Sequence, residues 1–457
     1  MISDRDTIFA LSSGQLPAAI AVVRISGPRA RFALETLAPK IPEPRRAALR
    51  KLRNPATKDV LDDALVVWFP GPNTETAEDM VELHLHGGRA VVAAVLGVLG
   101  KVEGLRPAGP GEFTRRAFEN GRLDLTAVEG LADLVSAETE AQRAQAMRQF
   151  SGALGQRAES WRQRLIGALA LVEARIDFSD EADVPEDLVS PALHAARELA
   201  EEIEEMLRDE RRGERLREGL VVAIAGPPNA GKSSLLNRLA QREAAIVSPY
   251  AGTTRDVIEV HLDVEGYPVT LLDTAGIRES DDPVEQEGVR RARARAEAAD
   301  VVLWVVDASE AGAAASNDGR TIASDEKYWL VRNKADLLDL EQKLLAVGAE
   351  SSILDSLEFL VSATLGTGVE TLIAALADHA RRSFSTSEPA LVTRERHRIA
   401  LQQAAEALRR SLAEGAGRED VVAEELRLAA RALGRLTGRV DVEDVLDVIF
   451  RDFCIGK

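Results

Sequence analysis

Residues 226–233 read Gly226-Pro227-Pro228-Asn229-Ala230-Gly231-Lys232-Ser233, a phosphate-binding loop of the GxxxxGK[ST] type. The apolar run 220–225 before it predicts a buried strand, and 234–239 after it predicts the start of a helix. In that setting backbone N–H groups surround phosphate oxygens at the positive end of the helix. Lys232 can then reach the terminal phosphates, and the Ser233 hydroxyl can bind Mg²⁺. The loop predicts a nucleotide-binding α/β unit.

Further nucleotide motifs follow the loop in order. Asp273-Thr274-Ala275-Gly276 ends a predicted strand, where the Asp can hold the water shell of the metal and the Gly amide can meet the γ-phosphate. Asn333-Lys334-Ala335-Asp336 follows an apolar run, and its Asp can accept hydrogen bonds from guanine N1–H and the exocyclic amine. Ser362-Ala363, after the next apolar run, suits the loop that meets the guanine carbonyl. The set predicts GTP binding.

Between the phosphate-binding loop and the DxxG motif, Gly252-Thr253-Thr254-Arg255-Asp256 has the composition of a mobile switch segment, and Thr254 is predicted to be the second Mg²⁺ ligand. The residues predicted to contact GTP are Asn229, Ala230, Gly231, Lys232, Ser233, Ser234, Ser248, Pro249, Tyr250, Ala251, Gly252, Thr253, Thr254, Asp273, Thr274, Ala275, Gly276, Asn333, Lys334, Asp336, Ser362, Ala363 and Thr364.

The hydrolytic group is not obvious from these motifs. Many GTPases place a Gln directly after DxxG to orient the attacking water, but here that position is Ile277, which is apolar. The polar function must come from elsewhere, and the following loop, 278–287, is rich in acids. Asn229 allows two interpretations: its side-chain carbonyl can ligate a monovalent cation that neutralises developing charge, or it is a turn residue.

Composition places the chain among globular proteins. It has 457 residues, enough for about three domains, with 45% hydrophobic and 29% charged residues. We see no apolar run of membrane-spanning length and no secretion signal at the N-terminus. One Cys excludes an intramolecular disulfide framework and fits a reducing cytoplasm.

The net charge of −18 argues against non-specific coating of nucleic acid, so an RNA partner needs a local basic patch. Such runs are more often solvated helix faces. The candidates are Arg45, Arg46, Arg50, Lys51 and Arg53; Arg115, Arg116 and Arg122; and Arg290, Arg291, Arg293 and Arg295.

The N-terminal segment, 1–119, reads as α+β. Strands are predicted at 20–26 and 64–69, and residues 80–86 alternate, with Val81, Leu83 and Leu85 on one face. His84 and His86 share the other face with Glu82. They suggest zinc only weakly, because no third ligand lies nearby, and we favour strand residues that face a pocket or interface.

Helical patterns flank the nucleotide-binding segment. Trp161, Leu165, Leu169 and Val172 recur at helical spacing, and Ser190-Pro191 predicts a cap and first turn for a helix through Glu210. Ser383–Pro389 reads as a linker, followed by helices at 398–412, 421–436 and 442–453, the last capped by Asp441. We therefore expect a multidomain α/β and all-α protein, with a Ras-like P-loop GTPase domain inserted into a helical bundle. The predicted domains are 1–119, 120–217, 218–382 and 383–457.

The chain ends Phe453-Cys454-Ile455-Gly456-Lys457. The Cys has the spacing of a prenylation box, but Gly456 and Lys457 fit that box poorly. A thiol at a chain end is either a nucleophile or redox group, or an incidental small residue, and the residues alone leave both open.

These features together resemble the MnmE/TrmE-type tRNA modification GTPases over nearly the whole chain. The specific elements are Arg24-Ile25-Ser26-Gly27, Pro110–Phe118 (PGEFTRRAF), Leu123-Asp124-Leu125, the GTP motifs through Asp273–Glu279 (DTAGIRE), and the terminal Phe-Cys-Ile-Gly-Lys. The resemblance implies a folate-binding-like N-terminal domain that forms a homodimer and holds a formyl- or methylene-tetrahydrofolate. It also implies a flavin-dependent partner, MnmG (GidA), with which an aminomethyl-type group is installed on the wobble uridine of certain tRNAs.

Carried over residue by residue, the resemblance assigns further roles. K⁺ is bound by Asn229, by the backbone of Ser248 and Tyr250, and by Thr253. Mg²⁺ is bound by Ser233 and Thr254. Glu285 orients the attacking water, and Cys454 serves the modification chemistry. Folate contacts fall on Arg24, Glu82, Arg122 and Lys457. The segment 14–19 stands where relatives carry a Gly-Arg-Gly-Gly-type loop, so pterin or dimer contacts are expected to differ there.

The leading hypothesis is thus a K⁺-stimulated GTPase whose conformational cycle gates uridine modification in a complex with a flavoprotein. The alternative is an Era-like GTP switch in ribosome assembly, which accounts for the GTP motifs but not for the terminal Cys or the N-terminal half.

Overall fold

The computed structural model describes most of the chain. The described residues are 6–178, 187–209, 211–242, 259–273, 299–309, 327–339, 357–384, 390–415 and 417–440, with Leu446, Ile449 and Gly456. They form two compact units. Unit 1 draws on the segments Met1–Ala132, Gln149–Glu201 and Gln403–Lys457, and unit 2 on Asp133–Arg148 and Glu202–Gln402. No helix among these residues is long and apolar enough to cross a bilayer.

Unit 1 contains a six-stranded sheet in the order β3-β4-β5-β2-β1-β6, antiparallel except for the β1–β6 pair. Its strands are β1 (Thr7–Leu11), β2 (Ile20–Ser26), β3 (Ala48–Arg53), β4 (Val60–Phe69), β5 (Met80–His86) and β6 (Leu105–Pro107). The predicted strand at 80–86 is confirmed, including its alternation: Val81, Leu83 and Leu85 are buried. Side chains on that face pack against α1 (Ala30–Leu37) and α2 (Arg89–Leu99) in one hydrophobic core.

The opposite face of this sheet is covered differently along its width. At β1, Phe113 of α3 (Glu112–Glu119) packs on Ile8 and Ala10. Further across, large apolar side chains are open to solvent: Ile20 is 60% exposed, Leu49 66% and Leu65 41%. These three positions lie on the face that also carries Glu82 and His84, since Leu65 is the register partner of His84. We call this side of the sheet the open face, because it leaves more aliphatic side-chain surface exposed to solvent than one side of a sheet usually does.

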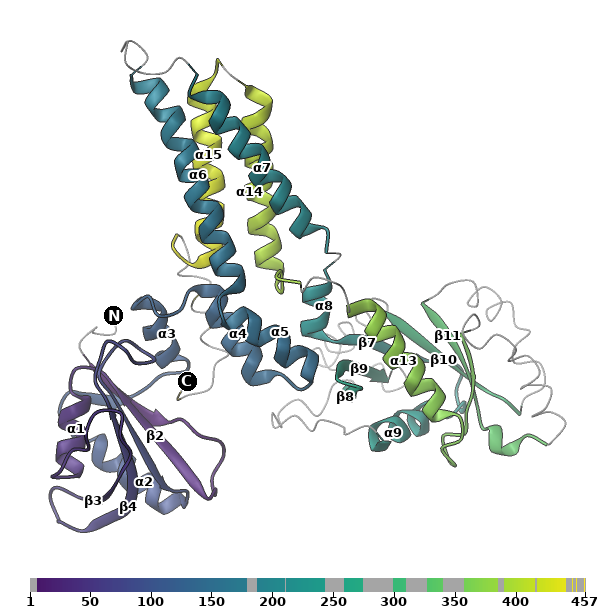
Figure 1. Cartoon of the computed structure of the whole chain (residues 1–457). Helices are drawn as coiled ribbons and strands as arrows, with labels where there is room; N and C mark the ends of the chain where they lie inside the picture. The colour runs from purple at the N-terminus through teal and green to yellow at the C-terminus, as the bar shows by residue number, and fades with distance from the viewer. Residues whose placement is uncertain are drawn as a thin grey trace, which may run out of the picture. The chain divides into compact units, whose positions relative to one another are not determined.

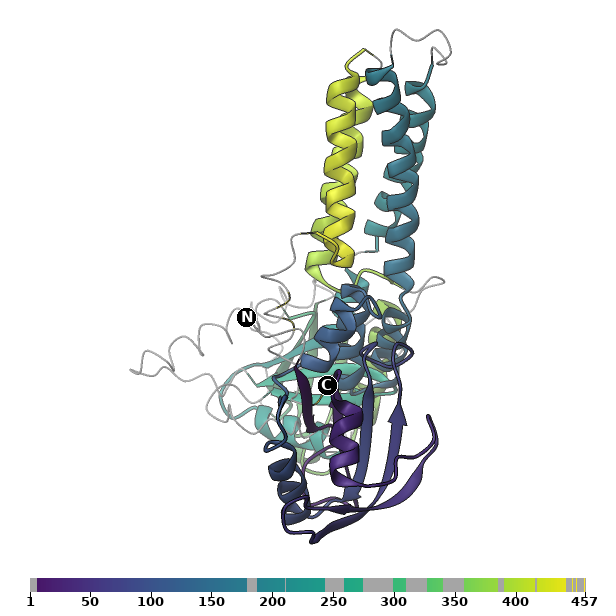
Figure 2. The same ribbon diagram turned by 90° about the vertical axis from the view of Figure 1, so that its left-hand side faces the viewer.

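A helical bundle completes unit 1. Figures 1 and 2 both show α6 (Ala153–Asp177), α7 (Val189–Leu207), α14 (Glu395–Glu414) and α15 (Glu419–Thr437) side by side. Along α6, Trp161, Leu165 and Val172 are buried as predicted, whereas Leu169 is half-buried and the fully buried neighbour is Ala168. Helices from before and after the nucleotide-binding segment therefore share one bundle.

Several predicted helix boundaries are wrong; in particular, α7 ends at Leu207 rather than at Glu210, and α14 begins at Glu395 rather than at Arg398. Helix α7 begins at Val189, and the acceptor at its start is Asp187, whose Oδ1 receives the Ser190 N–H at 2.9 Å. Ser190 is therefore inside the first turn, because Asp187 offers the capping carboxylate three residues earlier. Helix α13 (Val369–Phe384) continues through Ser383, which was predicted as linker. The predicted helix at 442–453 lies outside the described residues except for Leu446 and Ile449, which are helical.

Unit 2 is built on a second six-stranded sheet, in the order β12-β11-β10-β7-β9-β8, parallel except for the β8–β9 hairpin. Its strands are β7 (Leu220–Ala225), β8 (Glu259–Val264), β9 (Tyr267–Asp273), β10 (Val301–Asp307), β11 (Tyr328–Asn333) and β12 (Glu358–Leu360). Helices α9 (Lys232–Arg242) and α13 contribute to its core. Because β7 lies between β10 and β9, its carboxyl end is where the order reverses, the usual ligand position in such sheets.

Shorter helices lie before the bundle and before this sheet in the sequence. Helices α4 (Leu125–Ser136) and α5 (Glu140–Phe150) precede the bundle, and α8 (Arg212–Glu218) leads into β7. Arg398 of α14, which follows the sheet in the sequence, binds to the segment from the end of α7 to α8, which precedes the sheet. Its Nη2 lies 2.8 Å from Asp209 Oδ1, its Nε donates to Glu214 Oε1 at 2.9 Å, and its Nη1 donates to the Leu207 carbonyl at 3.1 Å. The three charged side chains are about nine-tenths buried.

Candidate functional site

The phosphate loop between β7 and α9 depends on two glycines with positive φ. Gly226 has φ +137°, and a Cβ there would lie 2.1 Å from the Val305 carbonyl oxygen. Gly231 has φ +88°, and a Cβ there would lie 2.3 Å from Asn333 Nδ2. Both contacts exclude any side chain. The loop is thus packed directly against β10 and against the start of the base-recognition motif.

Charged and polar groups gather at this loop. Lys232 Nζ donates to the carbonyls of Gly226 and Pro227 at 2.9 and 2.8 Å, so its ammonium group is held at the loop itself. Ser233 Oγ donates to Asp273 Oδ2 at 3.1 Å. A hydroxyl and a carboxylate oxygen this close are the ligand types that Mg²⁺ prefers. The structure therefore brings together the predicted Mg²⁺ ligand and the Asp of the DxxG motif.

The base-recognition end is organised around Asn333, which is 2% exposed. Its Nδ2 donates to the Ala230 carbonyl at 2.9 Å, and its Oδ1 accepts the Ala363 N–H at 3.0 Å. Ser362 Oγ lies 2.5 Å from Asp336 Oδ1. Three motifs separated by up to 133 positions in sequence, counted from Ala230 to Ala363, are therefore locked into one loop cluster.

Lys334 of the same motif has φ +65° and pairs with Asp307 at the end of β10, with 2.5 Å between Nζ and Oδ2. Burial raises the pKa of Asp307, but hydrogen bonds from Lys334 and Ser309 lower it by more. The net result is a pKa below the ordinary value of an Asp carboxyl. The pair therefore holds the Lys334 ammonium group at the end of β10.

Asn229 is exposed and has φ +62°, a left-handed conformation that Asn tolerates better than most residues. This geometry suits the turn interpretation, and it also leaves the side-chain amide unburied. The other predicted K⁺ ligands, Ser248, Tyr250 and Thr253, lie outside the described residues. Asn229 therefore fits both a turn residue and a K⁺ ligand.

Several predicted site residues lie outside the described residues: Ser248, Pro249, Tyr250, Ala251, Gly252, Thr253, Thr254, Thr274, Ala275, Gly276, Glu285, Cys454 and Lys457. The same holds for the basic run at Arg290, Arg291, Arg293 and Arg295.

A second polar site lies on the open face of the unit 1 sheet. Arg24 and Glu82 are register partners on β2 and β5, with 3.1 Å between Nη2 and Oε1. Arg24 Nη1 also pairs with Glu75 at 2.6 Å, and its guanidinium carbon lies 5.9 Å from the Phe113 ring centroid. Arg24 Nε is buried and has no hydrogen-bond partner among the described residues. Arg122 is exposed, and no hydrogen bond or ion pair in the described part of the chain joins it to Arg24 or Glu82.

The histidines of β5 are paired with carboxylates. His84 Nε2 lies 3.4 Å from Glu82, and His86 Nδ1 lies 2.7 Å from Asp62. Within the described ranges, no group of three or more His, Cys, Asp or Glu side chains could hold a metal ion.

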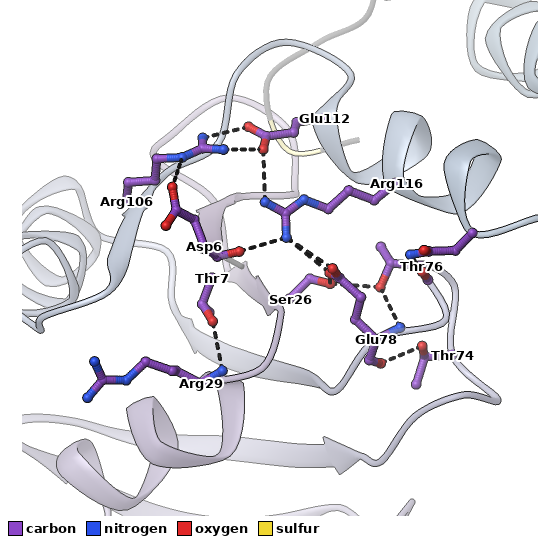
Figure 3. Close-up of polar contacts among 11 residues, drawn as sticks. Asp6, Thr7, Ser26, Arg29, Thr74, Thr76, Glu78, Arg106, Glu112 and Arg116 are labelled. Atoms are coloured by element: carbon purple, nitrogen blue, oxygen red, sulfur yellow. Dashed lines mark hydrogen bonds and ion pairs between the residues drawn. The ribbon is translucent and has the colours of Figure 1, made fainter. Parts of the chain in front are cut away.

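Figure 3 shows a buried charge network that the sequence did not reveal. Arg106 and Arg116 both donate to Glu112, with the shortest contact, 2.6 Å, from Arg106 Nη2. Arg116 Nη1 also donates to the Asp6 carbonyl at 2.8 Å and to Glu78 at 3.2 Å. Burial raises the pKa of Glu112, but the hydrogen bonds from Arg106, Gly109 N–H and Arg116 outweigh this and hold the pKa below its usual value.

This network corrects one prediction. Arg116 was a candidate for an RNA-binding patch, but it is 7% exposed and is neutralised by two carboxylates. Glu78 continues the network to Ser26, whose Oγ donates at 2.6 Å. Arg116 and Glu112 are four residues apart on one helix, but the contacts of Arg116 with Glu78 and with the Asp6 carbonyl join residues 38 and 110 positions apart, and no local sequence pattern predicts those two contacts.

Comparison with known proteins covers the chain from end to end. Two family models match: the MnmE helical domain over residues 125–454, and the GTP-binding protein TrmE N-terminus over residues 7–122. A tRNA modification GTPase MnmE from Bradyrhizobium sp. (strain ORS 278) is 57% identical over 451 residues, 99% of each chain. The tRNA modification GTPase MnmE of Rhodopseudomonas palustris (strain BisB18) is 56% identical over 459 residues, 100% of each chain.

Among solved structures, Era in complex with MgGDPNP and nucleotides 1506–1542 of 16S ribosomal RNA matches at 26% identity. The match covers 41% of this chain and 66% of that one, with a TM-score of 0.26. The relatives that span the whole chain are therefore the ones that decide its family.

Proposed function

We propose that this chain, which belongs to the family of MnmE tRNA modification GTPases, acts on the wobble uridine of certain tRNAs. As a member of the family it is a GTP hydrolase that acts in tRNA modification. The modified position would be C5, which receives an aminomethyl or carboxymethylaminomethyl group. The observation that carries the proposal is identity above 55% across the full length, including both flanks of the nucleotide site.

The nucleotide site supports a specific division of labour. Asp336 would accept hydrogen bonds from the guanine edge, and Asn333 holds the loops around it. Ser233, with Thr254, would bind Mg²⁺, which neutralises charge on the transferring phosphoryl group. Ile277 cannot aim a water, so we assign that role to Glu285 in the acidic loop that follows.

We propose that K⁺ stimulates hydrolysis. Asn229 would supply a side-chain oxygen, with the backbone of Ser248 and Tyr250 and with Thr253 as further ligands. A monovalent cation there would supply the positive charge that an arginine finger supplies in other GTPases. The exposed amide of Asn229, at the rim of the phosphate loop, is compatible with that role.

We propose that unit 1 holds a tetrahydrofolate derivative at Arg24, Glu82, Arg122 and Lys457, and that this ligand supplies the one-carbon unit. A guanidinium and a carboxylate side by side offer both the donor and the acceptor that a pterin and its glutamate tail require. The buried Nε of Arg24, which has no partner within the described residues, is an orphaned donor of the kind that a ligand satisfies.

The proposed assembly is a homodimer that acts with the FAD-dependent protein MnmG in the cytoplasm. The open sheet face at Ile20 and Leu65 supports dimerisation, because aliphatic surface this exposed is stabilised when a second copy covers it. Cys454 would then serve the modification chemistry. The boundaries 1–119, 120–217, 218–382 and 383–457 remain our proposal for the domains.

The test is mass spectrometry of tRNA nucleosides from cells lacking the chain, complemented with either the parent or the Cys454→Ser variant. We expect loss of a 5-aminomethyl-type wobble uridine in the deletion, rescue by the parent, and no rescue by Cys454→Ser although it still hydrolyses GTP. An unchanged nucleoside profile in the deletion would contradict the proposal and favour an Era-like switch. Full rescue by Cys454→Ser would make the thiol incidental.

A further inference from the structure

One stretch of this acidic chain is strongly basic. Within the 19 residues 40–58 there are seven Lys or Arg and one carboxylate, Glu43, whereas the chain as a whole carries a net charge of −18. The seven residues, which we call the basic edge, are Lys40, Arg45, Arg46, Arg50, Lys51, Arg53 and Lys58.

The basic edge is also contiguous in space. Strand β3 carries Arg50, Lys51 and Arg53, and it is the outermost strand of its sheet (Figure 1). The preceding loop returns to it, because Arg50 Nε donates to the Lys40 carbonyl at 2.7 Å. The following turn does the same, because Arg53 Nη1 donates to the Lys58 carbonyl at 3.0 Å. Six of the seven residues are exposed, and Arg50 is partly so.

Three of the four arginines of the basic edge are oriented by neutral acceptors rather than by carboxylates. Arg50 and Arg53 donate to backbone carbonyls, and Arg45 donates to the Asn73 carbonyl. A neutral acceptor orients a guanidinium but leaves its charge available to another partner.

The carboxylate pairs at the basic edge are few and exposed. Arg46 pairs with Glu43 at 3.1 Å and Lys51 with Asp63 at 3.7 Å, and the carboxylates are 72% and 47% exposed. Solvent-exposed pairs of this kind contribute little and exchange readily.

Protection of an edge strand against pairing with other chains is the plain alternative for such charges. That role needs only one or two lysines on the strand itself. It accounts neither for basic residues in the loop and turn on both sides nor for guanidiniums fixed in orientation by carbonyls.

We infer that the basic edge is the surface at which this chain contacts the phosphates of its tRNA. The inference rests on the proposed function and adds where the RNA is met. A polyanion is the partner that matches an unneutralised positive strip on a chain of opposite overall charge, since binding releases the counterions condensed on its phosphates. Backbone groups on the free side of β3 can add hydrogen bonds to phosphate oxygens.

The test compares two triple variants of the full-length chain that carry the same charge change. One is Arg50→Gln with Lys51→Gln and Arg53→Gln. The control is Arg410→Gln with Arg418→Gln and Arg427→Gln, three bundle arginines that are each paired with a carboxylate. Fluorescence anisotropy with labelled, unmodified tRNA transcript gives the dissociation constant at several KCl concentrations, and thermal unfolding confirms that both variants fold.

We expect the basic-edge variant to bind tRNA at least about tenfold more weakly at 0.1 M salt, with a log–log salt slope shallower by roughly 2 to 3. The control variant should stay close to the parent, and GTP hydrolysis without tRNA should be unchanged in both. Equal losses in both variants, or an unchanged slope in the first, would overturn the inference. A parent chain with no tRNA affinity would also overturn it, whereas the nucleoside profile of the deletion strain tests the proposed function separately.

Discussion

Ser362 Oγ lies 2.5 Å from Asp336 Oδ1, so the loop after β12 holds the carboxylate that would read the guanine base. Ser362 is fully buried, and its Oγ also accepts the Leu365 N–H at 3.1 Å. The hydroxyl therefore has a fixed direction in which to donate. Base recognition depends on this second loop as much as on the motif that carries the Asp.

Replacing Asp336 with Ala should remove the preference for guanine over hypoxanthine. Inosine triphosphate lacks the exocyclic amine, so the parent should bind it roughly 10- to 100-fold more weakly than GTP through loss of one charge-assisted hydrogen bond. In Asp336→Ala the two nucleotides should bind alike. The measurement is the ratio of their dissociation constants, with Asp339→Ala as the control that keeps the parent's ratio. A preserved ratio in Asp336→Ala would assign discrimination to another group.

Replacing Glu285 with Ala should abolish GTP hydrolysis while leaving GTP affinity nearly intact, because orienting the attacking water matters only in the transition state. Single-turnover hydrolysis and equilibrium nucleotide binding measure the two effects. Glu287→Ala, in the same acidic loop, is the control and should hydrolyse GTP like the parent. If Glu285→Ala lost both properties equally, the residue would be structural.

The buried network around Glu112 predicts a dependence of stability on pH. Because the folded state depresses the pKa of this carboxyl, its contribution is present above the pKa of the unfolded chain and is lost as pH falls through the folded value. Hydrogen exchange of the α3 amides should report less protection as pH falls below about 4.5, after correction for intrinsic rates.

Glu112→Gln is the matched variant for that measurement. It should lack this part of the pH dependence and should lose about 2–4 kcal/mol of local stability at pH 7, since it leaves two guanidiniums with one carboxylate fewer. A variant with the parent's pH dependence would show that another carboxyl is responsible.

Ala77 has φ +62°, in the left-handed region that costs a residue with a Cβ about 1 kcal/mol or more. Ala77→Gly should therefore stabilise unit 1 by about 0.5–1 kcal/mol, after the extra entropy that Gly has in the unfolded chain. Gly111→Ala tests the converse at φ +62°, the start of α3, and should destabilise by a similar amount. Urea unfolding gives both values, and a loss of stability in Ala77→Gly would contradict the strain argument.

His379 of α13 stands edge-on to Trp329, with 5.6 Å between ring centroids. Burial, together with the charge of Arg382, lowers its pKa, so the folded state takes up a proton less readily than the unfolded chain. The unfolding free energy of unit 2 should therefore fall as pH drops below about 6.5, the unfolded value. His379→Phe keeps the ring contact and should lack that decline. An identical decline in the variant would exclude His379 as its source.

The sequence correctly predicted elements whose structure depends on neighbouring residues, such as strands with alternating apolar side chains and the phosphate-binding loop. The alternation at 80–86 matched β5, and the GxxxxGK[ST] loop lies between β7 and α9 as expected. Pairings across the chain were out of reach, because they depend on strand register and on how α3 packs. The sequence therefore suggested that Arg116 belongs to a surface patch, although it is buried and forms ion pairs with Glu78 and Glu112. At α7, two capping groups competed three residues apart, and sequence alone did not show that Asp187 prevails.

The contacts of Arg398 with Asp209 and Glu214 have a topological consequence. All six strands of the nucleotide-binding sheet lie between Glu214 and Arg398 in the sequence. With the contact of Arg398 to the Leu207 carbonyl at the end of α7, these bonds close the intervening segment into a loop whose two ends meet. The entropy of closing a loop rises only with the logarithm of its length, about 0.6 kcal/mol for each doubling. Insertions and deletions inside the segment therefore cost the helices almost nothing, and evolution can resize the nucleotide-binding part without redesigning the bundle that carries it.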